Sequence, residues 1–249
     1  MERAVALARG DGTWTPPPLR SASTVVLLRD SSAGLETYLM RRARSMAFAP
    51  GMHVFPGGGV DDRDSTMGAS LPADGFPFAQ SCVRASADEA EVRALVACAL
   101  REVQEEAGVV LSAADLVLAD HWITPQAESH RYDVRFFAAR LPEGQDARPH
   151  GTEADRATWI TPTAALQAYW AGQLPMLPPT VAAVAFLAEH ASVDSALQAA
   201  GRRQLAPRMP HAFLGPDGDL RWVILNERTG EVLAERLGPP EASEVDGIR

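Results

Sequence analysis

Short apolar runs separated by polar or glycine-containing segments divide much of the chain into predicted strands. Ser23–Arg29 and Glu36–Arg41 are two such runs, and Asp30–Leu35 between them has the composition of a turn. Two further runs, Leu116–Thr124 and Tyr132–Arg140, are predicted to pair across the loop that joins them. Shorter strands are predicted at Thr158–Ile160, Leu220–Asn226 and Val232–Arg236, the last two forming a hairpin.

The segment Ser86–Ala107 has the hydrophobic period of a helix. Its apolar residues recur about every 3.6 positions, and Gly108 follows as a residue that commonly ends a helix. The apolar stripe consists of Val92, Leu95, Val96, Ala99, Leu100, Val103 and Ala107. Other helices are predicted at Pro162–Ala171, Pro179–His190 and Val193–Ala200. Helices that alternate with strands favour an α/β sandwich.

Three glutamates lie close together near the end of the predicted long helix. Glu102, Glu105 and Glu106 stand at positions i, i+3 and i+4, so their side chains leave the helix on one flank. Carboxylates this close repel one another unless a cation lies between them, and oxygen ligands suit Mg²⁺ or Mn²⁺. The pattern predicts a divalent-metal site; the alternative is that the glutamates belong to a solvated helix face.

The residues around these glutamates match a known motif. Gly57-Gly58, followed downstream by REVQEEAGV at Arg101–Val109, resembles the Nudix box of the Nudix hydrolases, which reads Gly, five residues, Glu, seven residues, Arg-Glu-apolar-x-Glu-Glu-x-Gly-apolar. Two features depart from that pattern: Asp64 stands where the family has Glu, and 36 residues separate Asp64 from Arg101. We interpret the excess as an insertion at about 65–85, because this segment is turn-rich and has no hydrophobic period.

The resemblance implies a fold and a domain organisation. The expected fold is a Nudix-type three-layer α/β/α sandwich with a mixed sheet, followed by a C-terminal extension of helices and a hairpin. We expect a flexible N-terminal arm at 1–18, the Nudix hydrolase domain at 19–190, and an extension at 191–249 that packs on the domain. The implied activity is divalent-metal-dependent hydrolysis of a nucleoside diphosphate linked to another moiety.

Metal ligands follow from the resemblance by position. Glu102, Glu105 and Glu106 would hold Mg²⁺ or Mn²⁺, and the Gly58 carbonyl would complete a coordination sphere. Arg101 would form an ion pair that orients a carboxylate, most simply that of Glu105 one helical turn further on. Bound ions would neutralise the diphosphate and lower the pKa of an attacking water.

The residue that removes the proton of this water varies within the family. We therefore keep two alternatives, Glu102 and an acid in a more distant loop. For the distant acid, Glu153 is preferred to Glu128, because Glu153 lies in the segment just before the predicted strand Thr158–Ile160, where Nudix proteins often place another glutamate. For either loop residue the alternative is a solvated carboxylate without a catalytic role.

A group of arginines upstream of the glycines suggests the substrate. The segment that contains Arg41, Arg42 and Arg44 resembles the one that precedes the box in coenzyme A-hydrolysing Nudix enzymes, and these side chains could bind a 3′-phosphate or the pyrophosphate. The alternative is that they make a strand end soluble. Other Nudix substrates (NADH, ADP-ribose or a dinucleoside polyphosphate) also stay open, as does an inactive Nudix-fold module that senses a ligand.

Composition limits the remaining function classes. The chain of 249 residues has a net charge of −9, which argues against a general nucleic-acid-binding surface. All 23 basic residues are arginine, so chemistry that depends on lysine is excluded. Two cysteines indicate a reducing compartment, and no apolar run is long enough to cross a bilayer. We expect a cytoplasmic enzyme that acts on a small nucleotide-like diphosphate, without a nucleic-acid or membrane partner, and leave a homodimer open.

Overall fold

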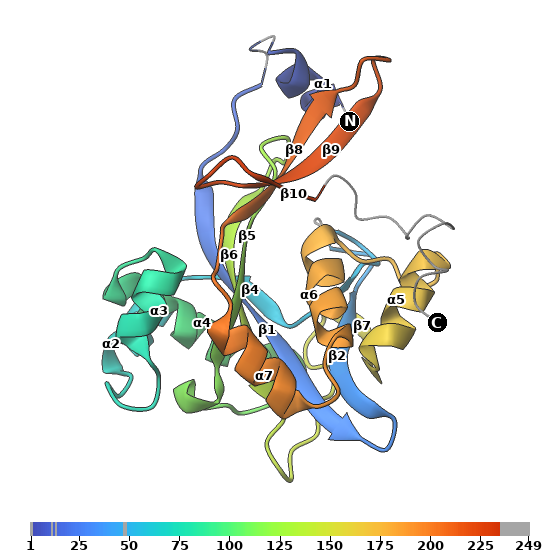
Figure 1. Ribbon diagram of the computed structural model, residues 1–249. Helices are drawn as coiled ribbons and strands as arrows, with labels where there is room; N and C mark the ends of the chain where they lie inside the picture. The colour runs from blue at the N-terminus through green and yellow to red at the C-terminus, as the bar shows by residue number, and fades with distance from the viewer. Residues whose placement is uncertain (1, 11, 13, 47–48, 235–249) are drawn as a thin grey trace.

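A mixed β-sheet forms the centre of the molecule (Figure 1). The computed structural model describes residues 2–10, 12, 14–46 and 49–234. Its strands are β1 (Leu19–Ser31), β2 (Gly34–Arg42), β3 (His53–Val54), β4 (Gly57–Gly59), β5 (Val117–Ile123), β6 (Arg131–Arg140), β7 (Ala154–Ile160), β8 (Arg208–Leu214), β9 (Leu220–Asn226) and β10 (Val232–Ala234). They lie in the order β10-β9-β8-β5-β6-β1-β2-β3, with β4 paired to β1 and β7 to β2.

Helices cover both faces of this sheet (Figure 1). The helices are α1 (Glu2–Arg9), α2 (Asp62–Ser70), α3 (Phe78–Ala85), α4 (Glu89–Ala107), α5 (Pro162–Trp170), α6 (Pro178–Ala188) and α7 (Val193–Arg202), with a 3₁₀ turn at Ala113–Asp115. One buried cluster joins the sheet to α3 and α4 and contains Val25, Leu95 and Phe137. The second joins the opposite face to α5, α6 and α7 and contains Trp122 and Val184. These layers confirm the predicted α/β/α sandwich with a mixed sheet.

The pairing of β1 places the glycine-rich strand beside α4. β1 runs parallel to β6 and antiparallel to both β2 and β4. A Cβ atom at Gly57 would lie 2.4 Å from the Ser23 carbonyl oxygen, so only glycine allows β4 to approach β1 this closely. The Ser23 hydroxyl in turn donates to the Leu95 carbonyl of α4 at 2.7 Å. Strand β4 and the motif helix are therefore both fixed against the same strand.

Several predicted elements agree closely with the structure. The long helix predicted from Ser86 begins at Glu89, because the Asp88 side chain caps it by accepting from the Glu91 N–H. It ends before Gly108, the residue predicted to end it, whose φ of 68° is left-handed. The hairpin predicted near the C-terminus is confirmed by β9 and β10; the part of that prediction at 235–236 lies outside the described residues.

Three segments differ from the prediction. The segment at about 65–85, interpreted from the sequence as an insertion, was expected to lack regular structure, but it contains most of α2 and all of α3. Asp61 caps α2, and α3 packs on α4. The N-terminal arm was also expected to be irregular, whereas Glu2–Arg9 forms α1 and contacts β8. Strand β8 was not predicted, because Pro210 interrupts its pattern. Among the described residues no helix is both long and apolar enough to span a membrane.

Candidate active site

Arg101 forms a buried ion pair that joins the two halves of the motif. Its guanidinium donates to both carboxylate oxygens of Asp64, at 2.8 and 2.7 Å, and to the Gly59 carbonyl at 3.1 Å. The Asp64 side chain is fully buried and the Arg101 side chain is 8% exposed. Arg101 also reaches Glu102 at 2.5 Å and Glu105 at 3.2 Å, so the predicted Arg101–Glu105 pair is present. The principal partner is Asp64, although 36 residues lie between them in the sequence.

Gly58 lies directly against Glu102. A Cβ atom at Gly58 would lie only 2.3 Å from Glu102 Oε1, so the missing side chain provides the space for this carboxylate. Burial raises the pKa of Glu102, while the hydrogen bond from Arg101 acts in the opposite direction. The Gly58 carbonyl, which was predicted to be a metal ligand, accepts from Cys98 Sγ at 3.4 Å.

Glu105 lies at the mouth of the cluster, and its side chain is 48% exposed. It accepts from two guanidinium groups: Arg101 at 3.2 Å and Arg63 at 3.3 Å. Arg63 belongs to the first turn of α2 and also binds Asp61 at 2.6 Å. Sequence analysis did not identify Arg63, because its contact with Glu105 joins residues 42 positions apart.

Glu106 lines a small cavity that opens between α4 and the end of β2. The cavity lining consists of Met40, Arg42, Val54, Glu106, His150, Glu153 and Ala154. Glu106 Oε2 accepts from the Gly57 N–H at 2.8 Å, yet burial raises the pKa of Glu106 to about 8. The charges of Glu102 and Glu153 add to this increase in pKa. Glu106 and Glu153 therefore line the same cavity, and Glu102 lies close enough to act on the pKa of Glu106.

Backbone contacts hold the loop that carries Glu153 in place. The His150 N–H donates to the Glu106 carbonyl at 2.8 Å, and the Ala43 N–H donates to the Glu153 carbonyl at 2.8 Å. These bonds connect the loop to the end of α4 and to the residue after β2. Of the two predicted loop acids, Glu153 lines the cavity; Glu128, in the loop between β5 and β6, is not part of that lining.

The three predicted substrate-binding arginines lie in different environments. Arg42 lines the cavity beside Glu106. Arg41 precedes it on β2, where successive side chains point to opposite faces, and it binds both oxygens of Asp155 at 2.7 Å. Arg44 is exposed beyond the end of β2. The structure therefore brings one of these arginines to the carboxylates, while Arg41 is engaged in an ion pair elsewhere.

The donor set suits a hard divalent ion, but the side chains are not arranged around one. Within the described part of the chain, no group of three His, Cys, Asp or Glu side chains is arranged to hold a metal. Instead, Glu102 and Glu105 accept from guanidinium groups, and Glu106 accepts from a backbone N–H. In this all-oxygen set, burial and neighbouring carboxylates raise the pKa of Glu102 and of Glu106. Mg²⁺ or Mn²⁺ would stabilise the set if the carboxylates turned toward the ion.

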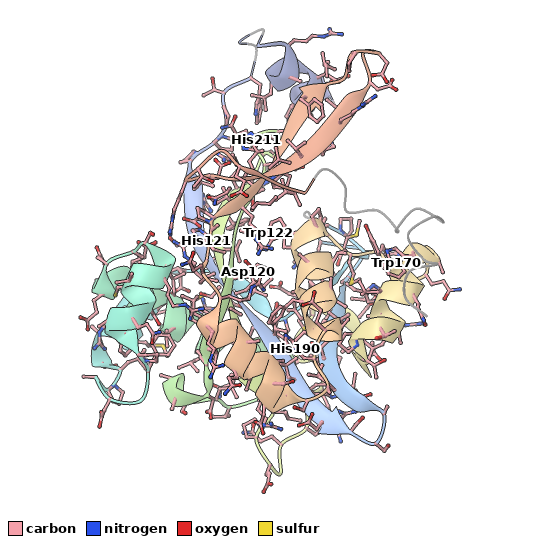
Figure 2. The ribbon with its side chains drawn as sticks, in the orientation of Figure 1. Asp120, His121, Trp122, Trp170, His190 and His211 are labelled. Atoms are coloured by element: carbon pink, nitrogen blue, oxygen red, sulfur yellow. The ribbon has the colours of Figure 1, made fainter. Side chains whose placement is uncertain are left out.

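A second buried polar cluster lies on β5 and β6. His121 Nε2 contacts Asp133 Oδ1 at 2.5 Å, and Arg135 binds the same carboxylate and donates to the Ala85 carbonyl of α3 at 3.1 Å. Trp122, the next residue on β5, points to the opposite face of the sheet (Figure 2). Sequence analysis did not identify this cluster, which connects the sheet to the end of α3.

Comparisons with known proteins identify one domain type. A NUDIX domain model matches residues 86–179, which include the glutamates of α4 but neither Gly58 nor Asp64. "Putative nudix hydrolase 7" of Caenorhabditis elegans is 24% identical over 173 residues, covering 65% of this chain and 58% of that protein, so the chain spans little more than half of this curated relative. A solved structure of a NUDIX hydrolase from Alicyclobacillus acidocaldarius aligns with a TM-score of 0.64 and 26% identity, covering 73% of this chain and 96% of the other.

Proposed function

We propose that this chain, which contains a Nudix domain, is a divalent-metal-dependent pyrophosphohydrolase that cleaves the diphosphate of a nucleoside diphosphate linked to another moiety. The observation that carries the proposal is the group of carboxylates at one end of α4. The charges of Glu102 and Glu153 add to the effect of burial in raising the pKa of Glu106. Glu106 and Glu153 line one cavity, which Arg42 also lines. Repulsion between these carboxylates lowers the stability of the folded protein, and a bound cation would offset this loss.

The chain's own residues have distinct roles in this proposal. Glu102, Glu105 and Glu106 would hold Mg²⁺ or Mn²⁺ beside the Gly58 carbonyl. The bound ion would neutralise the diphosphate and lower the pKa of an attacking water. Arg101 would be a positioning residue, because its bidentate bond to Asp64 fixes the guanidinium that orients Glu102 and Glu105.

Glu153 is the residue we propose as the general base. It lies on the loop that is hydrogen-bonded to the end of α4, and it lines the cavity with Glu106. Glu102 is less suited to this role, since Arg101 donates to it at 2.5 Å and thereby favours its function as an oriented ligand. Glu128 is outside the cavity lining and is not proposed.

Coenzyme A or an acyl derivative is the substrate that we propose. Arg42 supports this proposal, because a guanidinium beside the carboxylate cavity is suited to binding a phosphate oxygen. Arg44, exposed beyond the same strand, provides a second cation for a more distant phosphate. A homodimer and a cytoplasmic location stay predictions from the sequence.

The test is a pyrophosphatase assay with Mg²⁺ or Mn²⁺ on coenzyme A, NADH, ADP-ribose and dinucleoside polyphosphates. We expect cleavage of coenzyme A at the diphosphate. Glu105→Gln should reduce kcat by at least about a hundredfold, because a proposed metal ligand is lost. The far-UV circular dichroism spectrum should stay unchanged, because the Glu105 side chain is 48% exposed and is therefore not part of the core. If the Glu105→Gln enzyme stays active, Glu105 is not a metal ligand. If the wild-type protein cleaves none of these compounds, the proposed activity is refuted.

A further inference from the structure

Arg63 occupies an unusual place beside the carboxylate cluster. It lies in the first turn of α2, next to Asp64, which binds Arg101. Its Nε donates to Asp61 at 2.6 Å and its Nη1 donates to Glu105 at 3.3 Å. The Arg63 side chain is 58% exposed. A positive side chain thus occupies one oxygen of a proposed metal ligand.

The two arginines that bind Glu105 differ in how firmly they are held. Arg101 is buried and donates to four oxygen atoms besides that of Glu105: both carboxylate oxygens of Asp64, Oε1 of Glu102 and the Gly59 carbonyl. Arg63 is largely solvated, and its other hydrogen-bond partner within the described residues, Asp61, is only two positions away in the sequence. Because exposed ion pairs contribute little, Arg63 can leave Glu105 at small cost, whereas Arg101 cannot.

Arg63 also lies beside a carboxylate that, in the proposed function, would hold the ion that binds the diphosphate. Its Nη1 donates to Oε1 of Glu105, whose side chain is 48% exposed, so a diphosphate held by an ion on that carboxylate would lie close to Arg63. Guanidinium groups bind phosphate oxygens in a two-pronged geometry. Asp61 would continue to hold Nε and leave the two terminal nitrogens available for that contact.

We propose that Arg63 is an exchangeable counter-cation of Glu105 and a phosphate-binding residue for the substrate. Without a divalent ion it neutralises Glu105. When the ion takes that carboxylate, Arg63 releases it and binds a phosphate oxygen of the diphosphate. The inference rests on the proposed function, because it assigns Arg63 to the same metal and diphosphate site.

The first measurement is Mn²⁺ binding to the protein without substrate, by titration calorimetry. Arg63→Ala should bind Mn²⁺ about threefold to fivefold more tightly than wild type. In this variant the ion does not have to displace the Arg63 guanidinium from Glu105 and is not repelled by its charge. Arg63→Gln, which removes the charge but keeps a hydrogen-bonding side chain, should behave similarly. The matched control is Arg221→Ala: Arg221 also belongs to an exposed ion pair, with Asp217, and its side chain is 50% exposed, but it lies on β9.

The second measurement is binding of α,β-methylene-ADP, which cannot be cleaved at its diphosphate, at saturating Mn²⁺. Arg63→Ala should weaken this binding by about tenfold, as expected for loss of a charge-assisted hydrogen bond, and Arg63→Lys should recover part of it. Arg221→Ala should equal wild type in both measurements. Circular dichroism of each variant checks that α2 is retained.

The outcomes separate this inference from the proposed function. If wild type binds Mn²⁺ and cleaves substrate but Arg63→Ala matches Arg221→Ala throughout, the inference is wrong and the proposed function stands. Tighter Mn²⁺ binding with unchanged analogue binding would overturn the phosphate contact. If wild type neither binds Mn²⁺ nor cleaves any diphosphate, both are overturned.

Discussion

The buried pair of Asp64 and Arg101 gives the most direct test of how the interrupted motif is assembled. Asp64 is fully buried, and Arg101 donates to both of its oxygens at 2.8 and 2.7 Å. Asp64 also accepts from the Asp61 N–H at 2.9 Å and so completes the capping box of α2. Asp64→Ala removes all three bonds and leaves a buried guanidinium with a smaller set of partners.

The expected loss of stability is about 3 kcal/mol. Breaking a buried ion pair by removing one partner costs about 3–5 kcal/mol, because the remaining charge is desolvated without compensation. The lower end applies here because Arg101 keeps Glu102 and the Gly59 carbonyl. Asp64→Glu keeps the charge but adds a methylene group to a fully buried site, so we expect a smaller loss of about 1–2 kcal/mol.

Urea unfolding at pH 7, followed by circular dichroism, measures these differences. The control is Asp146→Ala, which breaks a pair between Asp146 and Arg148 whose side chains are both exposed, and it should change stability by less than about 0.5 kcal/mol. Unchanged m values are needed for the comparison. A loss below about 1 kcal/mol for Asp64→Ala would show that the pair does not hold the two halves of the motif together.

Two further predictions concern the glycines and a buried histidine. Gly58→Ala should reduce the proposed pyrophosphatase activity at least about tenfold, because the new Cβ would lie 2.3 Å from Glu102 Oε1. Gly59→Ala should keep most of that activity, because the nearest neighbour of its Cβ would be 3.7 Å away, and equal effects of the two substitutions would contradict the argument. Burial lowers the pKa of His121, although the hydrogen bond between His121 and Asp133 opposes this shift. The contribution of neutral His121 to stability is therefore complete above about pH 6.5, the pKa of an unperturbed histidine. This contribution is lost as the pH falls toward the lowered pKa of the folded state, at up to about 1.4 kcal/mol per pH unit. The urea midpoint of His121→Gln should therefore decline less between pH 7 and 5 than that of wild type; parallel declines would refute this assignment.

The sequence predicted those parts of the fold that depend on local patterns. The strand Leu220–Asn226 has the predicted bounds. The long helix stops at Gly108, because the backbone there takes the left-handed conformation that glycine adopts readily. The two helices of the insertion were not predicted. Helix α2 has few apolar residues, and its Gly68 packs so closely that a Cβ would lie 2.6 Å from the Arg93 backbone, which is a tertiary contact without a local signal.

The same distinction applies to the site. The helical spacing of Glu102, Glu105 and Glu106 was sufficient to predict that they share one flank of the helix. In the structure Glu106 accepts from the Gly57 N–H of β4, and the other two accept from Arg101. Arg63 and His150 reach the cluster only through folding of the insertion and of the loop before β7, so no spacing rule identifies them. The choice of Asp64 as the main partner of Arg101 likewise depends on where α2 packs.

The length of the segment between Asp64 and Arg101 explains why this segment needs a structure of its own. Closing a loop of 36 residues rather than one of seven costs about 1.5 kcal/mol more in loop-closure entropy. Burial of Phe76 and Phe78 against the α4 face of the sheet, at about 1.5–3 kcal/mol for each side chain, offsets that cost. A packed insertion also fixes α2, whereas a loose loop would leave Asp64 free to move away from Arg101. The burial of apolar residues far from the carboxylates thereby maintains the geometry of the motif.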